Sequence, residues 1–119
     1  NTPSGMPGVQ TIFPVMIDHV NNGKLSLSQL MNLMCENPCK IFGIKNKGYI
    51  KENFDADLTV VDMNKEVTIK NEMIASKCGW TPFHNYKVKG FPVGTIVNGK
   101  LVMVDGKILI ESTGKPLQF

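Results

Sequence analysis

The sequence predicts an α/β chain in which a helical first third is followed by a β segment. In the first third, apolar residues recur every three or four positions, which is the pattern of helices with one apolar face. From Gly48 onward the hydrophobic period becomes two, which is the period of a β-strand. Near the end lie Asn98-Gly99 and Asp105-Gly106, two dipeptides that favour tight hairpin turns.

Residues 1–11 are predicted to form a tight loop that leads into the first helix. Pro3, Gly5, Pro7 and Gly8 fall within the first eight residues. Proline fixes φ and glycine allows positive φ, so this run indicates a rigid turn whose backbone can approach a ligand closely. The alternative is an ordinary Pro/Gly loop. If the loop binds a ligand, its position suggests that the other half of the site lies upstream.

The first helix is expected over residues 12–20. Thr11 can cap it, and Pro14 falls in the first turn, where a missing N–H costs nothing. Asn21-Asn22-Gly23 ends it, because Gly and Asn suit the left-handed position after a helix. Its apolar face is predicted to consist of Phe13, Met16, Ile17 and Val20.

A second helix has a clear start, and a third follows it. Ser26 and Gln29 match a capping box, which Leu25 and Leu30 accompany as a hydrophobic staple. A third helix restarts at Asn37-Pro38 and ends before Gly43. The second helix's apolar stripe is predicted to be Leu27, Leu30, Met31 and Met34. No strand is predicted between these helices, so we expect them on the outside of a larger core.

The second part of the chain reads as strands joined by turns. Residues 58–62 and 66–69 are predicted strands, and residues 70–85 are a long irregular stretch. A three-stranded antiparallel meander is expected over residues 95–110, and the tail 112–119 is expected on the surface. A lone Trp, Trp80, is expected to anchor the irregular stretch on a core.

Charge and composition exclude several classes of function. The net charge is +3, and all 13 basic residues are Lys interleaved with acids, which argues against nucleic-acid binding. No apolar run approaches the roughly 18 residues of a membrane span. No signal peptide is expected. Three cysteines, an odd count, indicate reduced thiols and a cytoplasmic protein.

The cysteines also allow a metal hypothesis. Cys35, Cys39 and Cys78 together with one of His19 and His84 could bind zinc, although no C-x2-C pair exists. The alternative is that the cysteines are small buried hydrophobic residues.

Several motifs together resemble a known family. Gly48-Tyr-Ile50 and residues 55–62 are similar to the late β signature of the amidohydrolase superfamily. The segments that narrow the resemblance to the dihydroorotases, in the cyclic-amide hydrolase branch, are 3–11, 36–38, 41–43, 76–83 and 90–97. The resemblance runs over residues 2–119.

This resemblance implies a fold and two domains. Members have a (β/α)8 TIM barrel and a small β-sandwich built from both chain ends. Residues 1–44 would be the C-terminal end of the barrel, comprising its last loop and outer helices. Residues 45–119 would be the C-terminal part of the small antiparallel β-sandwich.

It also implies an activity, which is the interconversion of (S)-dihydroorotate and N-carbamoyl-L-aspartate in de novo pyrimidine biosynthesis. Zinc would supply a hydroxide that attacks the ring amide. The metal ligands and the catalytic Asp of the family match no residue of this chain, so we expect the segment alone to be inactive and to bind no metal. Ser4 and Gly5 match positions whose backbone contacts the substrate. The expected partners are this small molecule, the remainder of the polypeptide and further copies in a homo-oligomer, with no nucleic acid or membrane.

Two alternatives stay open. The parent enzyme could be a hydantoinase or allantoinase, although residues 76–83 resemble the dihydroorotases more closely. The chain could instead be a non-catalytic truncated fragment that acts only by association.

The resemblance also guides the interpretation of isolated polar residues. His19 and His84 match no family metal position, so they are interpreted as a helix-surface and a loop residue. Asn53 stands where the family usually has Gly, and Asn tolerates the left-handed conformation such a turn needs. Asp55 and Asp57 could be a metal-binding pair, but at the start of a strand they are expected to bond turn amides.

Overall fold

The computed structural model describes residues 5–110 and 114–119. The chain divides into two compact units. The first unit comprises Asn1–Lys24 and Met63–Phe91, and the second comprises Leu25–Asp62 and Pro92–Phe119. Among the described residues, no helix is both long enough and apolar enough to cross a membrane.

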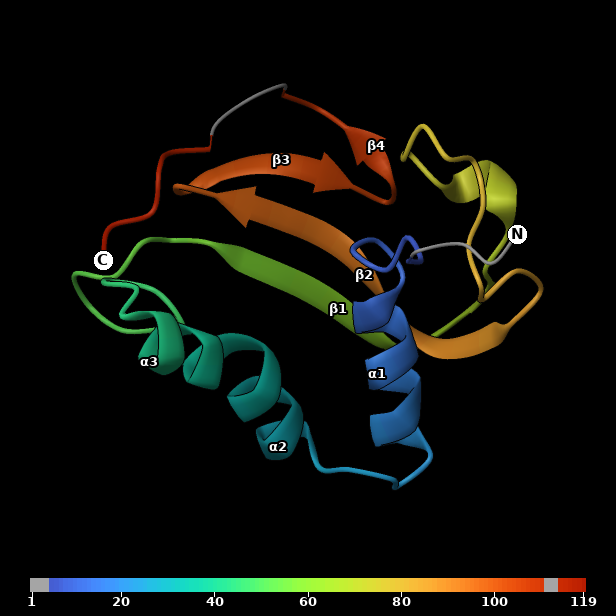
Figure 1. The fold of residues 1–119 in the computed structure, drawn as a ribbon, viewed down its shortest axis with the longest axis horizontal. Coiled ribbons are helices and arrows are strands. Elements are labelled where there is room, and N and C mark those ends of the chain that lie inside the picture. The colour runs from blue at the N-terminus through green and yellow to red at the C-terminus, as the bar shows by residue number, and fades with distance from the viewer. Residues whose placement is uncertain (1–4, 111–113) are drawn as a thin grey trace. The chain divides into compact units, whose positions relative to one another are not determined.

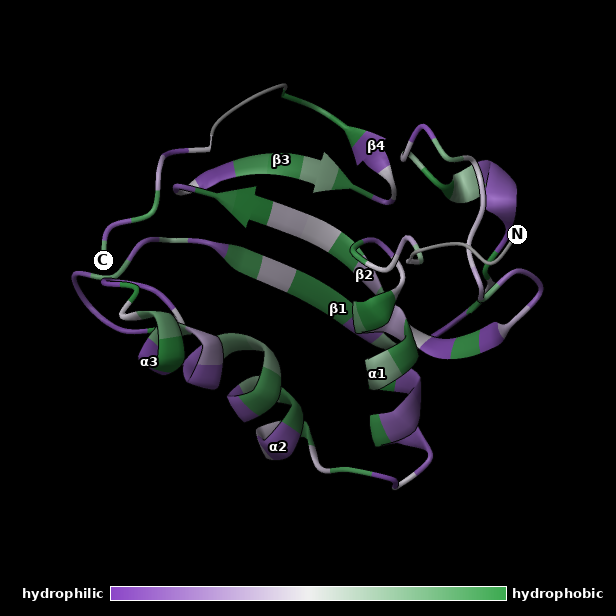
Figure 2. Cartoon of the chain, in the orientation of Figure 1, coloured by the Kyte–Doolittle hydropathy of each residue, from purple (hydrophilic) through white to green (hydrophobic). Residues whose placement is uncertain are grey.

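Within the described part of the chain, four strands form one sheet in the order β1-β2-β3-β4 (Figure 1). They are β1 (Leu58–Thr68), β2 (Lys87–Val97), β3 (Lys100–Val104) and β4 (Lys107–Ile108). The β2–β3 and β3–β4 pairs are antiparallel, which confirms the predicted meander. Figure 2 shows that β1, β2 and β3 each mix hydrophobic and polar residues along their length.

Both predicted hairpin turns are present. Asn98 and Gly99 have φ of 49° and 75°, and Val97 pairs with Lys100 across the turn. Asp105 and Gly106 repeat the pattern with φ of 45° and 79°. Two successive residues at positive φ match the right-handed twist of the flanking strands, which is why Asn-Gly and Asp-Gly favour these turns.

The first two strands are longer than predicted. β1 is one strand where the sequence predicts two, 58–62 and 66–69, separated by a gap at 63–65. More buried and more exposed positions keep alternating across this gap, as in a continuous strand. β2 begins at Lys87 rather than Thr95, with Val88 and Gly90 buried on alternate positions. Between the two strands, the irregular stretch contains a short 3-10 turn, η2 (Asn71–Met73).

In the first unit, α1 (Ile12–Asn21) supplies Val15 to a small core with Ile69 and Val88. Val67, Phe83 and Phe91 pack against these three residues. The fully buried face of α1 differs from the predicted apolar face and shares only Ile17 with it. The buried residues of α1 are Pro14, Val15, Ile17 and Asp18, whereas Phe13, Met16 and Val20 are half-buried.

Contacts with β2 explain this rotation of α1. The Asp18 carboxylate accepts a hydrogen bond from the backbone N–H of Lys89 at 2.9 Å. The Asn21 side-chain amide donates to the carbonyls of Lys89, at 2.6 Å, and Met63, at 2.9 Å. Gly90 makes the close approach possible, because a Cβ there would lie 2.1 Å from Cγ2 of Ile17.

In the second unit the chain stays helical from Leu27 to Phe42. The three parts are α2 (Leu27–Met31), the π-helical η1 (Asn32–Glu36) and α3 (Asn37–Phe42). The predicted interruption before Pro38 is absent, because Glu36 and Asn37 keep helical backbone angles. Pro38 therefore lies inside a continuous helical segment, directly after the wider π turn of η1, and π turns of this kind occur inside α-helices.

The predicted ends of this helical segment are confirmed. The Ser26 side chain accepts from the N–H of Gln29, and the Gln29 side chain accepts from the N–H of Ser26. Gly43 ends the segment in the left-handed conformation, with φ of 66°. Of the predicted apolar stripe, Leu30 is fully buried while Leu27 remains 48% exposed.

Candidate functional site

The N-terminal loop forms a compact turn directly ahead of α1. The carbonyl of Gly8 accepts hydrogen bonds from the N–H groups of Thr11, at 3.0 Å, and Ile12, at 2.8 Å. Thr11 takes the capping position, but its hydroxyl bonds back to the Gly8 carbonyl and not to the helix. Of the two predicted substrate residues, Gly5 is exposed, and Ser4 lies outside the described residues.

A glutamine joins this loop to the irregular stretch that follows β1. Nε2 of Gln10 donates to the Met73 carbonyl at 2.6 Å, and Oε1 accepts from the Ala75 N–H at 2.9 Å. Residues 7–11 and 74–76 line a hollow of about 400 Å³. Two segments that the sequence singled out separately are therefore side by side within the first unit.

Ser76, which lines this hollow, contacts the exposed thiol of Cys78. Sγ of Cys78 lies 3.1 Å from the Ser76 hydroxyl and 3.7 Å from the Trp80 carbonyl. The hydrogen bond with Ser76, followed by the backbone contact at Trp80, lowers the pKa of the Cys78 thiol. Trp80, which the sequence predicts to anchor this stretch on a core, is half-buried.

The rest of the irregular stretch is fixed by its own polar contacts. The Asn71 side chain accepts from the N–H of Thr81 at 3.0 Å, and its backbone N–H donates to Nδ1 of His84 at 3.1 Å. The backbones of Ile69 and Asn85 pair at 2.7 Å. The interpretation of His84 as a loop residue is confirmed. Its Nδ1 accepts the hydrogen bond from the Asn71 backbone.

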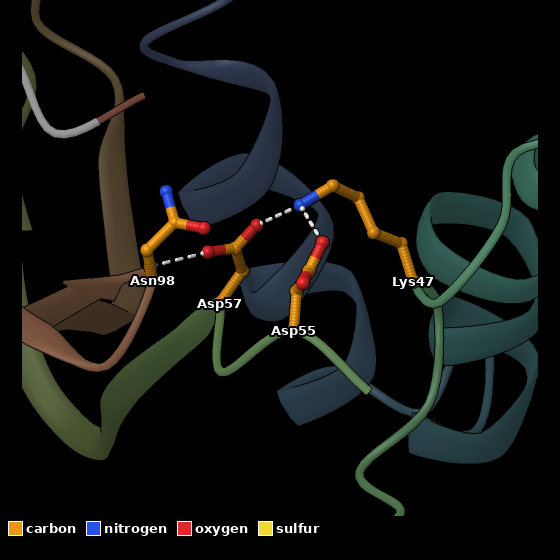
Figure 3. A network of polar contacts seen from close by, with 4 residues as sticks. All are labelled: Lys47, Asp55, Asp57 and Asn98. Carbon is orange, nitrogen blue, oxygen red and sulfur yellow. Dashed lines mark hydrogen bonds and ion pairs between the residues drawn. The ribbon is translucent and has the colours of Figure 1, made fainter. Parts of the chain in front are cut away.

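A second polar network lies in the second unit (Figure 3). The Lys47 ammonium forms ion pairs with Asp55, at 3.1 Å, and with Asp57. The other oxygen of Asp57 accepts from the backbone N–H of Asn98 at 2.7 Å. The bond from Asn98, followed by the contact with Lys47, lowers the pKa of Asp57. The pKa of Lys47 is raised, and the main cause is its hydrogen bond to Asp57.

This network joins the start of β1 to the β2–β3 turn. The expectation that these acids bond turn amides is confirmed for Asp57, whose carboxylate accepts from the Asn98 N–H in the turn. Asp55 instead pairs with Lys47. Asn53 adopts the left-handed conformation expected of it, with φ of 66°. The network holds the turn in place and leaves both carboxylates occupied by a cation.

The described residues do not fit a bound zinc ion. Within residues 5–110 and 114–119, no three His, Cys, Asp or Glu side chains converge where a metal could bind. Cys35 and Cys39 are half-buried beside Gly48, where a Cβ would lie 2.9 Å from Sγ of Cys39. Burial, followed by the charges of Cys39 and Glu36, raises the pKa of Cys35.

His19 differs from its predicted role as a helix-surface residue. It is half-buried, and its Nδ1 is buried without a hydrogen-bond partner. The same rotation of α1 that buries Asp18 also turns the neighbouring His19 partly inward. Sequence reasoning missed the roles of Asp18, Gln10 and Lys47. Asp18 and Gln10 bond backbone groups more than 60 residues away, whereas Lys47 pairs with two acids that follow it closely in the chain.

Comparison with known proteins places this loop and sheet in a family. The model of the amidohydrolase family matches residues 7–102. The chain belongs to the amidohydrolase family. A dihydroorotase from Pyrococcus furiosus is 43% identical over 113 residues, which are 95% of this chain and 26% of that protein. A dihydroorotase from Methanothermobacter thermautotrophicus is 37% identical over 97% of the chain and 26% of its own length.

A solved structure supports the fold. The L-hydantoinase (dihydropyrimidinase) from Arthrobacter aurescens matches 90% of this chain with a TM-score of 0.86 and 37% identity, over 24% of its own length. The chain thus spans about a quarter of the length of the relatives that it matches. The fold of this chain is therefore shared with that hydantoinase over the matched 90% of the chain.

Proposed function

We propose that this chain is the C-terminal part of a dihydroorotase, a zinc-dependent hydrolase of cyclic amides. The reaction would interconvert (S)-dihydroorotate and N-carbamoyl-L-aspartate in de novo pyrimidine biosynthesis. The observation that supports it best is the 43% identity to a dihydroorotase across 95% of the chain. The enzyme would be a cytoplasmic homo-oligomer.

The proposal assigns a place in the enzyme to each part of the chain. Residues 1–44 are the C-terminal end of the (β/α)8 barrel, and residues 45–119 are the C-terminal part of the small β-sandwich. Active sites of such barrels lie at the C-terminal ends of the strands, among the loops that follow them. A loop that directly precedes a helix, as residues 5–11 precede α1, fits that position.

Within this site, the loop contributes backbone groups. Ser4 and Gly5 would present N–H or carbonyl groups to the substrate carboxylate or ring amide. Backbone groups are strong hydrogen-bonding partners, and a glycine lets a ligand approach them closely. A Cβ added at Gly5 would meet no heavy atom within 4 Å, so the backbone there is open to a ligand.

The zinc chemistry belongs to the part of the enzyme outside this chain. The described residues offer no three converging metal ligands. Zinc would supply the hydroxide for ring opening when it is bound. The role left to this chain is to hold and orient the substrate, and the chain alone is expected to be inactive.

A hydantoinase is the second candidate, because a solved L-hydantoinase is 37% identical over 90% of the chain. Residues 76–83, which resemble dihydroorotases, favour the first candidate. The non-catalytic alternative would apply if the full-length protein lacked the upstream metal ligands.

Substrate assays on the full-length protein test the proposal. We expect turnover of dihydroorotate with zinc, little turnover of hydantoin or allantoin, and none by the 119-residue chain alone. In the full-length protein, Ser4→Pro removes a backbone N–H and should lower kcat/KM more than it lowers thermal stability. Preferred turnover of a hydantoin would establish the second candidate, and an unchanged kcat/KM would remove Ser4 from the site.

A further inference from the structure

Gln10 occupies the point where the N-terminal loop meets the stretch after β1. Its amide bonds two backbone groups two residues apart, the carbonyl of Met73 at 2.6 Å and the N–H of Ala75 at 2.9 Å. A carboxamide offers a donor and an acceptor in one plane, so it can pair with a backbone as a neighbouring strand does. A carboxylate or a thioether at this position could not make both bonds.

The second attachment of this loop is at Gly8. The Gly8 carbonyl accepts from Thr11 and Ile12, which ties the turn to the start of α1. Gln10 ties the same turn to a segment that is 63 to 65 residues away. The turn at residues 8–12 is therefore bonded both to the start of α1 and to residues 73–75. The hollow of about 400 Å³ is lined by residues of this turn and by residues 74–76.

We infer that Gln10 is a positioning residue for substrate binding. It holds the loop that contains Gly5 in its binding conformation before the substrate arrives. This inference rests on the proposed function, in which the Gly5 backbone contacts the substrate. A loop that must order itself on binding spends part of the binding free energy, and this loss raises KM more than it lowers kcat.

Two substitutions at Gln10 and one control test the inference in the full-length enzyme. Gln10→Met keeps the length of the side chain and removes both hydrogen bonds, so KM for dihydroorotate should rise about tenfold with kcat within about twofold. Gln10→Glu keeps an acceptor for Ala75 and should give an intermediate KM. Gln29→Met removes a capping-box bond in the second unit and should leave KM unchanged.

Amide hydrogen exchange supplies a readout that does not depend on the substrate. The Ala75 N–H should be protected in the wild type and should exchange faster in Gln10→Met, while thermal stability changes little. A wild-type KM in Gln10→Met would overturn the inference, as would an equal KM change in Gln29→Met or an unprotected Ala75 in the wild type.

The same set of variants separates the inference from the proposed function. If the wild type hydrolyses a hydantoin and not dihydroorotate, the proposed function fails, and the KM series for the hydantoin decides the role of Gln10. If the wild type hydrolyses dihydroorotate and Gln10→Met is kinetically normal, the proposed function stands and the inference fails.

Discussion

Gly90→Ala is expected to destabilise the protein strongly, because two penalties coincide at Gly90. Its φ is +97°, a region that residues with a Cβ rarely adopt. An added Cβ would lie 2.1 Å from Cγ2 of Ile17 and 3.0 Å from Nδ2 of Asn21. Ile17 is 1% exposed, so its side chain has no free space into which to move.

The magnitude follows from adding these penalties. Carbon atoms normally approach to about 3.5–4.0 Å, so the added methyl group overlaps Ile17 severely. Overpacking of a core costs about 1–3 kcal/mol. Backbone strain adds about 1–3 kcal/mol. We therefore expect a loss of about 2–6 kcal/mol, accompanied by loss of the Asn21 bonds to β1 and β2.

Gly23→Ala is the matched control. Gly23 also has positive φ, +69°, but a Cβ there would meet no atom within 4 Å. It should therefore show only the backbone penalty, about 1–2 kcal/mol. Thermal melts of both full-length variants, with amide exchange at Lys89 as a local probe, measure the difference. Equal destabilisation by the two substitutions would refute the packing argument.

Two further predictions concern charge. Asp57→Asn should lower stability by about 1 kcal/mol, because it weakens the ion pair with Lys47. Since the pKa of Asp57 is lowered in the folded state, its contribution is complete above about pH 4 and is lost as the pH falls through that lowered value. A stability difference from wild type that does not shrink as the pH falls below about 4 would contradict this prediction. Cys78 should be alkylated by iodoacetamide much faster than Cys35 at about pH 7.5. The lowered pKa of Cys78 favours the reactive thiolate, and its exposure gives the reagent access. Burial raises the pKa of Cys35 and so favours the unreactive thiol. Mass spectrometry after peptide digestion measures both rates, and similar rates would contradict it.

Local signals in the sequence predicted the parts of the fold that depend on few neighbouring residues. The Asn98-Gly99 turn follows from the positive φ that these two residues tolerate. The capping box follows from Ser26 and Gln29, which are three residues apart. Each motif contains all the partners it needs, so its geometry can be inferred without knowledge of the rest of the chain.

Features that depend on distant partners were not predictable in this way. The face that α1 buries is set by Gly90 and by the Lys89 N–H, about 70 residues away. Gln10 bonds backbone groups, which are the same at every position and leave no mark in the sequence. Gly5 and Ser4 remain predictions, since they derive from a resemblance.

The Asn98-Gly99 turn has a consequence for how this protein ages. Asn-Gly pairs deamidate when the glycine nitrogen attacks the asparagine side chain and closes a succinimide ring. In this turn the Gly99 nitrogen donates to the Ala56 carbonyl at 2.9 Å, and the Asn98 nitrogen donates to Asp57. The fold thus keeps the attacking nitrogen and its neighbour in hydrogen bonds, and chemical damage at this site should track the opening of the turn.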